Sequence, residues 1–76
     1  MNHVKLLFFA TLRERMGIKT LDLYVPADLT IQGLKDRLSA EYPKVNASLK
    51  SVVVSINREF APDESVIPQN AEIGMF

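Results

Sequence analysis

The side chains that could perform chemistry are few and scattered along the chain. There is one histidine, His3, and there is no cysteine. A metal site or a nucleophile–base pair built on His3 would need partners from elsewhere in the chain, and a histidine so close to a terminus is typically solvated. Without cysteine there is neither a thiolate nucleophile nor a disulfide framework. The sequence therefore predicts no catalytic or metal-binding role for His3.

Other reactive patterns are equally sparse. The serines have no histidine base nearby, no G-x-S-x-G motif occurs, and no glycine-rich loop could hold a phosphate. Asp63 and Glu64 are adjacent rather than facing, which indicates a solvated loop and not an acid–base pair. The run Arg13-Glu14-Arg15 is typical of the solvent-exposed face of a short helix. We expect no catalytic residue, no bound cofactor and no metal in this chain.

Length and charge narrow the class of protein. With 76 residues, we expect a single domain over residues 1–76 that is too small to enclose a deep pocket of its own. Nine basic and nine acidic residues balance, which argues against nucleic acid or an anionic membrane as the partner. The first apolar run is too short to span a bilayer and resembles no signal peptide. We therefore expect a cytoplasmic protein.

One segment, Thr30 to Tyr42, has the periodicity of a long helix. Its apolar residues recur at helical spacing and would share one face: Ile31, Leu34, Leu38 and Tyr42. Thr30 is placed to cap the first turn, and Pro43 disfavours helical geometry at the residue before it. Gly33 inside the helix indicates either a strand backbone passing close by or a tolerated exposed glycine.

The N-terminal part predicts two strands with a short helix between them. In the first strand, Val4 to Ala10, one set of alternating residues faces the core and leaves Leu7 and Phe9 on the other face. These two residues either form part of a contact surface or are covered by a loop or by the short helix. A capping-box pattern from Thr11 to Glu14 predicts that the helix starts there, and Gly17 is suited to end it. The second strand runs from Thr20 to Val25, where Pro26 ends it.

The C-terminal half predicts short strands. Residues 43–50 form a polar connector, and residues 52–57, rich in β-branched side chains, predict a strand at the centre of the sheet. Turns are expected at 57–59 and 69–70, with a brief strand at Glu59–Phe60 and an irregular segment at 61–68. A last strand, residues 71–76, would lie parallel to the first. The predicted class is α+β, with one sheet packed on one main helix.

Several segments resemble a known family in the same order and spacing. They are Val4–Gly17, Leu29–Leu38, Val54–Asn57 and Ala71–Phe76. Together they resemble the small, sulfur-carrying subunit of molybdopterin synthase, in the MoaD/ThiS-like, ubiquitin-like family. The resemblance implies a ubiquitin-like β-grasp fold, with a mixed sheet of about five strands on one main helix and a short helix after the first strand.

The resemblance also implies a function. Members of the family end in a flexible Pro-Pro-Val-x-Gly-Gly tail, whose terminal glycine a ubiquitin-activating-like adenylyltransferase adenylates with ATP. The tail then becomes a thiocarboxylate and delivers sulfur in the active site of the large subunit, within a heterotetramer. Catalytic residues would lie in the large subunit, so this chain would carry sulfur without binding a cofactor. The sequence stops at Phe76, which we expect to reflect truncation.

Two further expectations concern the turn before the last strand and, from the alternation in the first strand, an apolar patch. Asn70-Ala71 stands where the family usually has Gly-Asp, and asparagine should preserve the turn because it tolerates left-handed geometry. An apolar patch beside the exit of the tail should bind the large subunit and the activating enzyme in turn, through Leu7, Phe9, Met75 and Phe76. The alternatives are a carrier for the thiazole pathway or another small molecule, and a non-catalytic β-grasp interaction module. A native Gly-Gly terminus would favour a carrier.

Overall fold

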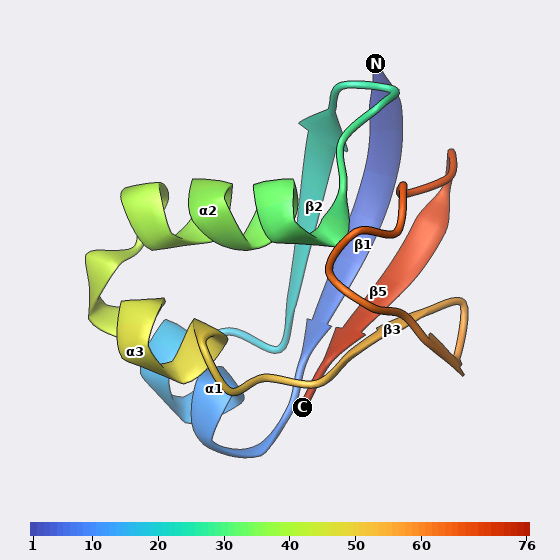
Figure 1. Ribbon diagram of the computed structural model, residues 1–76. Coiled ribbons are helices and arrows are strands. Elements are labelled where there is room, and N and C mark those ends of the chain that lie inside the picture. The colour runs from blue at the N-terminus through green and yellow to red at the C-terminus, as the bar shows by residue number, and fades with distance from the viewer.

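The computed structural model describes all residues from 1 to 76, which form a sheet and several helices of unequal length (Figure 1). In chain order the elements are β1 (Asn2–Phe8), α1 (Ala10–Met16), β2 (Thr20–Val25), α2 (Ile31–Glu41), the 3₁₀ helix η1 (Pro43–Val45), α3 (Asn46–Leu49), β3 (Val54–Ile56), β4 (Glu59–Phe60) and β5 (Ala71–Met75). None of the helices combines the length and the apolar character needed to cross a bilayer.

The five strands form one mixed sheet in the order β2-β1-β5-β3-β4. β1 and β5 are parallel neighbours, as predicted, and the other pairs are antiparallel. The prediction that the β-branched segment 52–57 lies at the centre is wrong, because β5 takes that place and β3 lies between β5 and the short edge strand β4. Local β-propensity favours a strand, but the crossover between β1 and β5 decides which strands are central.

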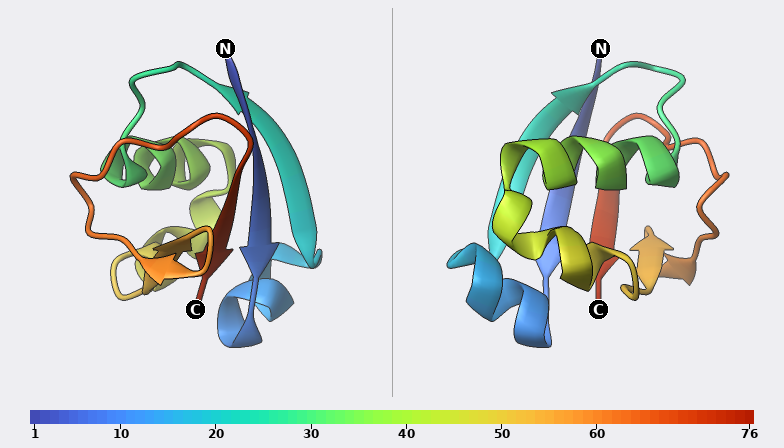
Figure 2. Two further views of the ribbon diagram at one scale, coloured as in Figure 1. Left: turned by 90° about the vertical axis from the view of Figure 1, so that its right-hand side faces the viewer. Right: turned by 60° about the vertical axis from the view of Figure 1, so that its left-hand side comes forward.

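α2 crosses one face of this sheet, and both views in Figure 2 show α2 and α3 on the same side of it. The Thr30 side chain accepts a hydrogen bond from the Gly33 amide at 3.1 Å, so the predicted cap is confirmed. Ile31, Leu34 and Leu38 are buried, as the periodicity predicted. No strand backbone crowds Gly33; a Cβ there would instead lie 2.5 Å from the side-chain Cδ1 of Leu29.

The core between helix and sheet is a single cluster of 17 buried apolar residues, six of which come from β1 and β5: Val4, Leu6, Phe8, Ala71, Ile73 and Met75. Residues 43–50 are not a polar connector, because they form η1 and α3 and bury Val45 and Leu49. These two residues are four apart in sequence, so consecutive helical turns point both toward the core. One pair of apolar residues in a polar segment was too weak a signal to predict this.

α1 begins two residues earlier than the capping-box prediction, which made Thr11 the N-cap, and it has no capping box. Phe9 occupies the N-cap position with no side-chain hydrogen bond, which places Thr11 inside the helix. The C-terminus follows the prediction: Gly17 has φ of 75° and its amide donates to the Arg13 carbonyl at 3.0 Å. The turn at Asn70 also forms as expected, with φ of 58°.

Candidate interaction surface

The face of the sheet opposite α2 carries the second set of alternating side chains. In the register of the sheet, Leu7 of β1 and Ser55 of β3 both lie opposite Gly74 of β5. A Cβ added to Gly74 would come within 2.6 Å of Ser55 Oγ and 3.1 Å of the Phe76 ring. No larger side chain fits at Gly74, because Ser55 and Phe76 already occupy the space above it. All three residues border a hollow on this open face.

This apolar hollow has a volume of about 480 Å³. Its lining comes from β1, β5 and the β3–β4 hairpin: Leu7, Phe9, Val53, Val54, Ser55, Arg58, Phe60, Glu72, Gly74 and Phe76. Phe60 is 74% exposed and Phe76 is 55% exposed. Large apolar side chains that cluster on the solvent-exposed surface are typical of sites that bind another protein.

Phe9 and Phe76 stack against one another at one end of the apolar hollow. Their ring centroids are 4.7 Å apart and the ring planes differ by 6°. The backbone beneath them is fixed: the Phe9 amide donates to the Met75 carbonyl at 3.1 Å, and Phe76 exchanges two hydrogen bonds with Val53 at 2.9 and 3.0 Å. The Phe9–Phe76 stack is therefore already formed in the free protein, and it makes one end of the apolar hollow aromatic.

The structure brings together three of the four residues predicted for the patch and separates the fourth. Leu7, Phe9 and Phe76 line the apolar hollow. Met75 is fully buried in the core, at 0% exposure, so its assignment to this surface is wrong. Successive residues of a strand point to opposite faces, and Phe76 and Met75 therefore cannot share one.

Sequence reasoning missed Phe60 and Val53, which extend the same hollow. The signal for Phe60 was present, because the turn at Asn57-Arg58 pairs Ser55 with Phe60 and puts both on one face. Val53 could not be found in this way, since it precedes β3 and meets Phe76 through backbone bonds outside the named strands.

Charged groups border the apolar hollow on the same face. Arg58 Nε lies 3.8 Å from Glu72 Oε1. Farther along the sheet, His3 Nε2 lies 3.0 Å from Asp22 Oδ1 and its ring is 5.3 Å from that of Tyr24. No group of three or more His, Asp or Glu side chains is arranged to hold a metal ion. What this face offers chemically is an apolar centre with a polar rim, the usual anatomy of a protein interface.

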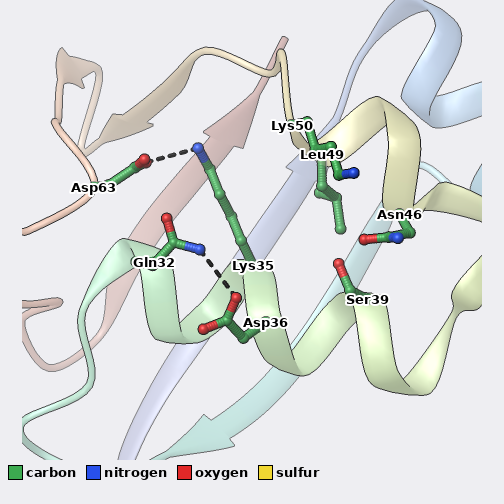
Figure 3. A pocket seen from close by; sticks show the side chains of 8 residues that line it. All are labelled: Gln32, Lys35, Asp36, Ser39, Asn46, Leu49, Lys50 and Asp63. Carbon is green, nitrogen blue, oxygen red and sulfur yellow. Dashed lines mark hydrogen bonds and ion pairs between the residues drawn. The ribbon is translucent and has the colours of Figure 1, made fainter.

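A second hollow, of about 280 Å³, lies on the helical side between α2 and α3 (Figure 3). Seven of its eight lining residues are polar. Lys35 Nζ and Asp63 Oδ1 are 2.7 Å apart, and Gln32 donates to Asp36 at 2.9 Å. Asp63, expected to be a solvated loop residue, thus ties the segment before β5 to α2.

Comparisons with known proteins agree with this architecture. The ThiS family matches residues 6–76. The "molybdopterin synthase sulfur carrier subunit" of Arabidopsis thaliana is 29% identical over 72 residues, covering 95% of this chain and 75% of that protein.

Solved structures show the same fold. Small archaeal modifier protein 1 of Haloferax volcanii superposes with a TM-score of 0.88 at 23% identity, over 100% of this chain and 97% of the other. The protein of the same name from Methanosarcina acetivorans gives 0.81 at 24% identity, over 99% and 91%. The β-grasp expectation is thereby confirmed, and because the family match extends over nearly the whole sequence, this chain belongs to the ThiS family.

Proposed function

We propose that this protein is the sulfur-carrier small subunit of a molybdopterin synthase in molybdenum cofactor biosynthesis, and that it delivers sulfur as a C-terminal thiocarboxylate. Membership of the ThiS family and the likeness to the Arabidopsis sulfur carrier subunit support the carrier role. The chain itself contributes no catalytic side chain to this reaction. The catalytic residues belong to the large subunit, and ATP is consumed by the activating partner.

The observation that carries the proposal is the position of the end of β5. β5 is the central strand, and it delivers Phe76 to the rim of the apolar hollow, beside Phe9. A tail that continues from Phe76 would start at the surface where a partner docks. Six further residues would extend up to about 20 Å, enough to enter a neighbouring active site. Docking and delivery are then coupled, because one contact both holds the partner and aims the tail.

We further propose that two partners use the apolar hollow in turn. The ubiquitin-activating-like adenylyltransferase would bind it first, to adenylate the tail and support thiocarboxylate formation. The large subunit would then bind the same surface in the cytoplasm, within a heterotetramer. Whichever protein docks would cover the same Phe9–Phe76 pair and the hollow beside it, so the two partners would exclude one another and charging and delivery would alternate.

The helix after β1 favours this pathway over the closest alternative. A carrier for thiazole synthesis or another small molecule would share the fold, but such carriers usually lack the short helix that this chain has as α1, Ala10–Met16. A non-catalytic β-grasp interaction module would use the same apolar hollow without any sulfur chemistry.

The test compares residues 1–76 with the same chain extended by Pro-Pro-Val-Ser-Gly-Gly. Each protein is incubated with the activating enzyme, ATP and a sulfur donor, and its mass is measured. We expect adenylation and exchange of one carboxyl oxygen for sulfur in the extended protein alone, since a carboxylate at Phe76 lacks the reach. A matched control ends in Gly-Ala, which adds a side chain to a tail that must thread a narrow channel. An extended protein that stays uncharged would favour the interaction module.

A further inference from the structure

Arg58 occupies a backbone conformation that a long side chain rarely adopts. The hairpin between β3 and β4 has a two-residue turn, because Ile56 pairs with Glu59 across it. Both turn residues have positive φ, 49° for Asn57 and 72° for Arg58. A turn of this kind favours Asn followed by Gly, since Gly alone takes positive φ without steric cost. Asn57 fits the preference and Arg58 does not.

The turn is held firmly enough to maintain that conformation. The Asn57 amide donates to the Glu72 carbonyl at 2.8 Å, and the Asn57 side-chain oxygen accepts from the Glu72 amide at 2.9 Å. These two bonds join the hairpin to the central strand β5. The turn residue next to Arg58 is therefore anchored to the sheet.

Inside the molecule the guanidinium has almost nothing to bind. The Arg58 side chain is 89% exposed, and its distance of 3.8 Å from Glu72 is longer than a hydrogen bond. At the same time the side chain lines the apolar hollow, near Phe60 and Phe76. An unfavourable backbone conformation with no compensating internal contact is a reason to look for a role outside the chain.

We propose that Arg58 is a specificity-determining residue, whose guanidinium donates hydrogen bonds to a carboxylate of the protein that docks in the apolar hollow. The inference rests on the proposed function, and its partner is the large subunit. A guanidinium presents a planar fork of donors that matches a carboxylate. Docking on the apolar side chains would exclude water beside this pair and strengthen it. Glu72 is close enough to attract Arg58 without engaging its donors.

Arg58→Gly separates this role from a purely structural one, because it should move stability and binding in opposite directions. Removing the strained side chain should raise the melting temperature by roughly 2–5 °C. Removing the guanidinium should weaken binding to the large subunit about tenfold, measured by calorimetry. A contribution to folding alone would leave the affinity unchanged.

Asn70→Gly is the matched control. Asn70 is also a turn residue at positive φ, 58°, but its amide donates to the His3 carbonyl and it does not line the apolar hollow. We expect this variant to bind the large subunit with wild-type affinity. Arg58→Lys keeps the charge but loses the fork, so its affinity should fall between those of wild type and Arg58→Gly.

Two results would overturn the proposal. If Arg58→Gly binds the large subunit as tightly as wild type, Arg58 makes no contact with the partner, while the proposed function still stands. If Arg58→Lys binds the large subunit as tightly as wild type, the planar guanidinium fork is not what the partner recognises, because a simple positive charge is then sufficient. Failure of the wild-type protein to bind the large subunit would instead contradict the proposed function, and with it the choice of the large subunit as the partner of Arg58.

Discussion

Where β1 and β5 end, both faces of the sheet carry apolar side chains, but the helices cover only one of these faces. In β1, Leu6 and Phe8 are 0% and 2% exposed beneath the helices, whereas the next residue, Phe9, is 38% exposed on the open face. In β5 the same contrast separates Met75 from Phe76. Composition does not distinguish these residues. What distinguishes them is whether the chain itself supplies the layer that covers them.

The contrast indicates how one strand can contribute to folding through one face and to binding through the other. The covered face uses its apolar side chains to hold α2, and the uncovered face leaves similar side chains for a second protein to bury. If that division holds, substitutions on the two faces should have separable effects. Those under α2 should lower the free energy of unfolding, and those in the apolar hollow should lower affinity and leave the fold intact.

The largest effect is expected under α2. Leu34→Ala or Leu38→Ala should destabilise the protein by roughly 2–5 kcal/mol, because each leaves a cavity in a single small core. A domain of this size can have little more than that to lose. Urea denaturation followed by circular dichroism measures the change. Asp36→Ala, an exposed substitution on the same helix, is the control. A loss no larger than that of the control would mean that the wrong face of α2 has been assigned to the core.

An effect of intermediate size is expected in the apolar hollow. Phe76→Ala should weaken binding to the large subunit by about 2 kcal/mol, because truncating a large aromatic side chain that a partner buries can cost that much. Its stack with Phe9 is solvent-facing, so the melting temperature should fall only slightly. Tyr24→Ala removes another exposed aromatic residue from the same face, well away from the hollow, and should bind normally. Wild-type affinity of Phe76→Ala, with the fold intact, would remove Phe76 from the interface.

How much of this the sequence predicts depends on the range of the interactions. Helical spacing in Ile31, Leu34 and Leu38 predicts α2, and alternation in β1 separates the two faces, since both patterns are local. The same alternation assigns Met75 to the core, but the expectation of a patch near the tail placed it on the surface together with Phe76. Proximity along the chain is no guide to which face a strand residue occupies.

Local sequence patterns could not predict the features that depend on contacts between residues far apart in the chain. The position of β5 at the centre follows from pairing with β1, more than sixty residues earlier in the chain. The lining of the apolar hollow also combines residues from three strands, among them Leu7, Ser55 and Gly74. The burial of Val45 and Leu49 likewise depends on two short helical turns whose propensity is weak on its own.

The smallest effect is expected in the polar hollow, which tests whether polar contacts on the helical side add much to the covered core. Asp63→Ala breaks the 2.7 Å pair with Lys35, whose side chain is 11% exposed. The loss should stay below about 1 kcal/mol, because Asp63 is half exposed and ion pairs that reach solvent contribute little. Two backbone bonds, from Gln32 to the Asp63 carbonyl and from Ile31 to the Ser65 carbonyl, should still hold the segment to α2. Urea denaturation at low and at high salt measures the loss, with exposed Glu64→Ala as the control. A loss approaching that of Leu34→Ala would show that this ion pair, as well as the apolar layer, determines the stability of the covered side.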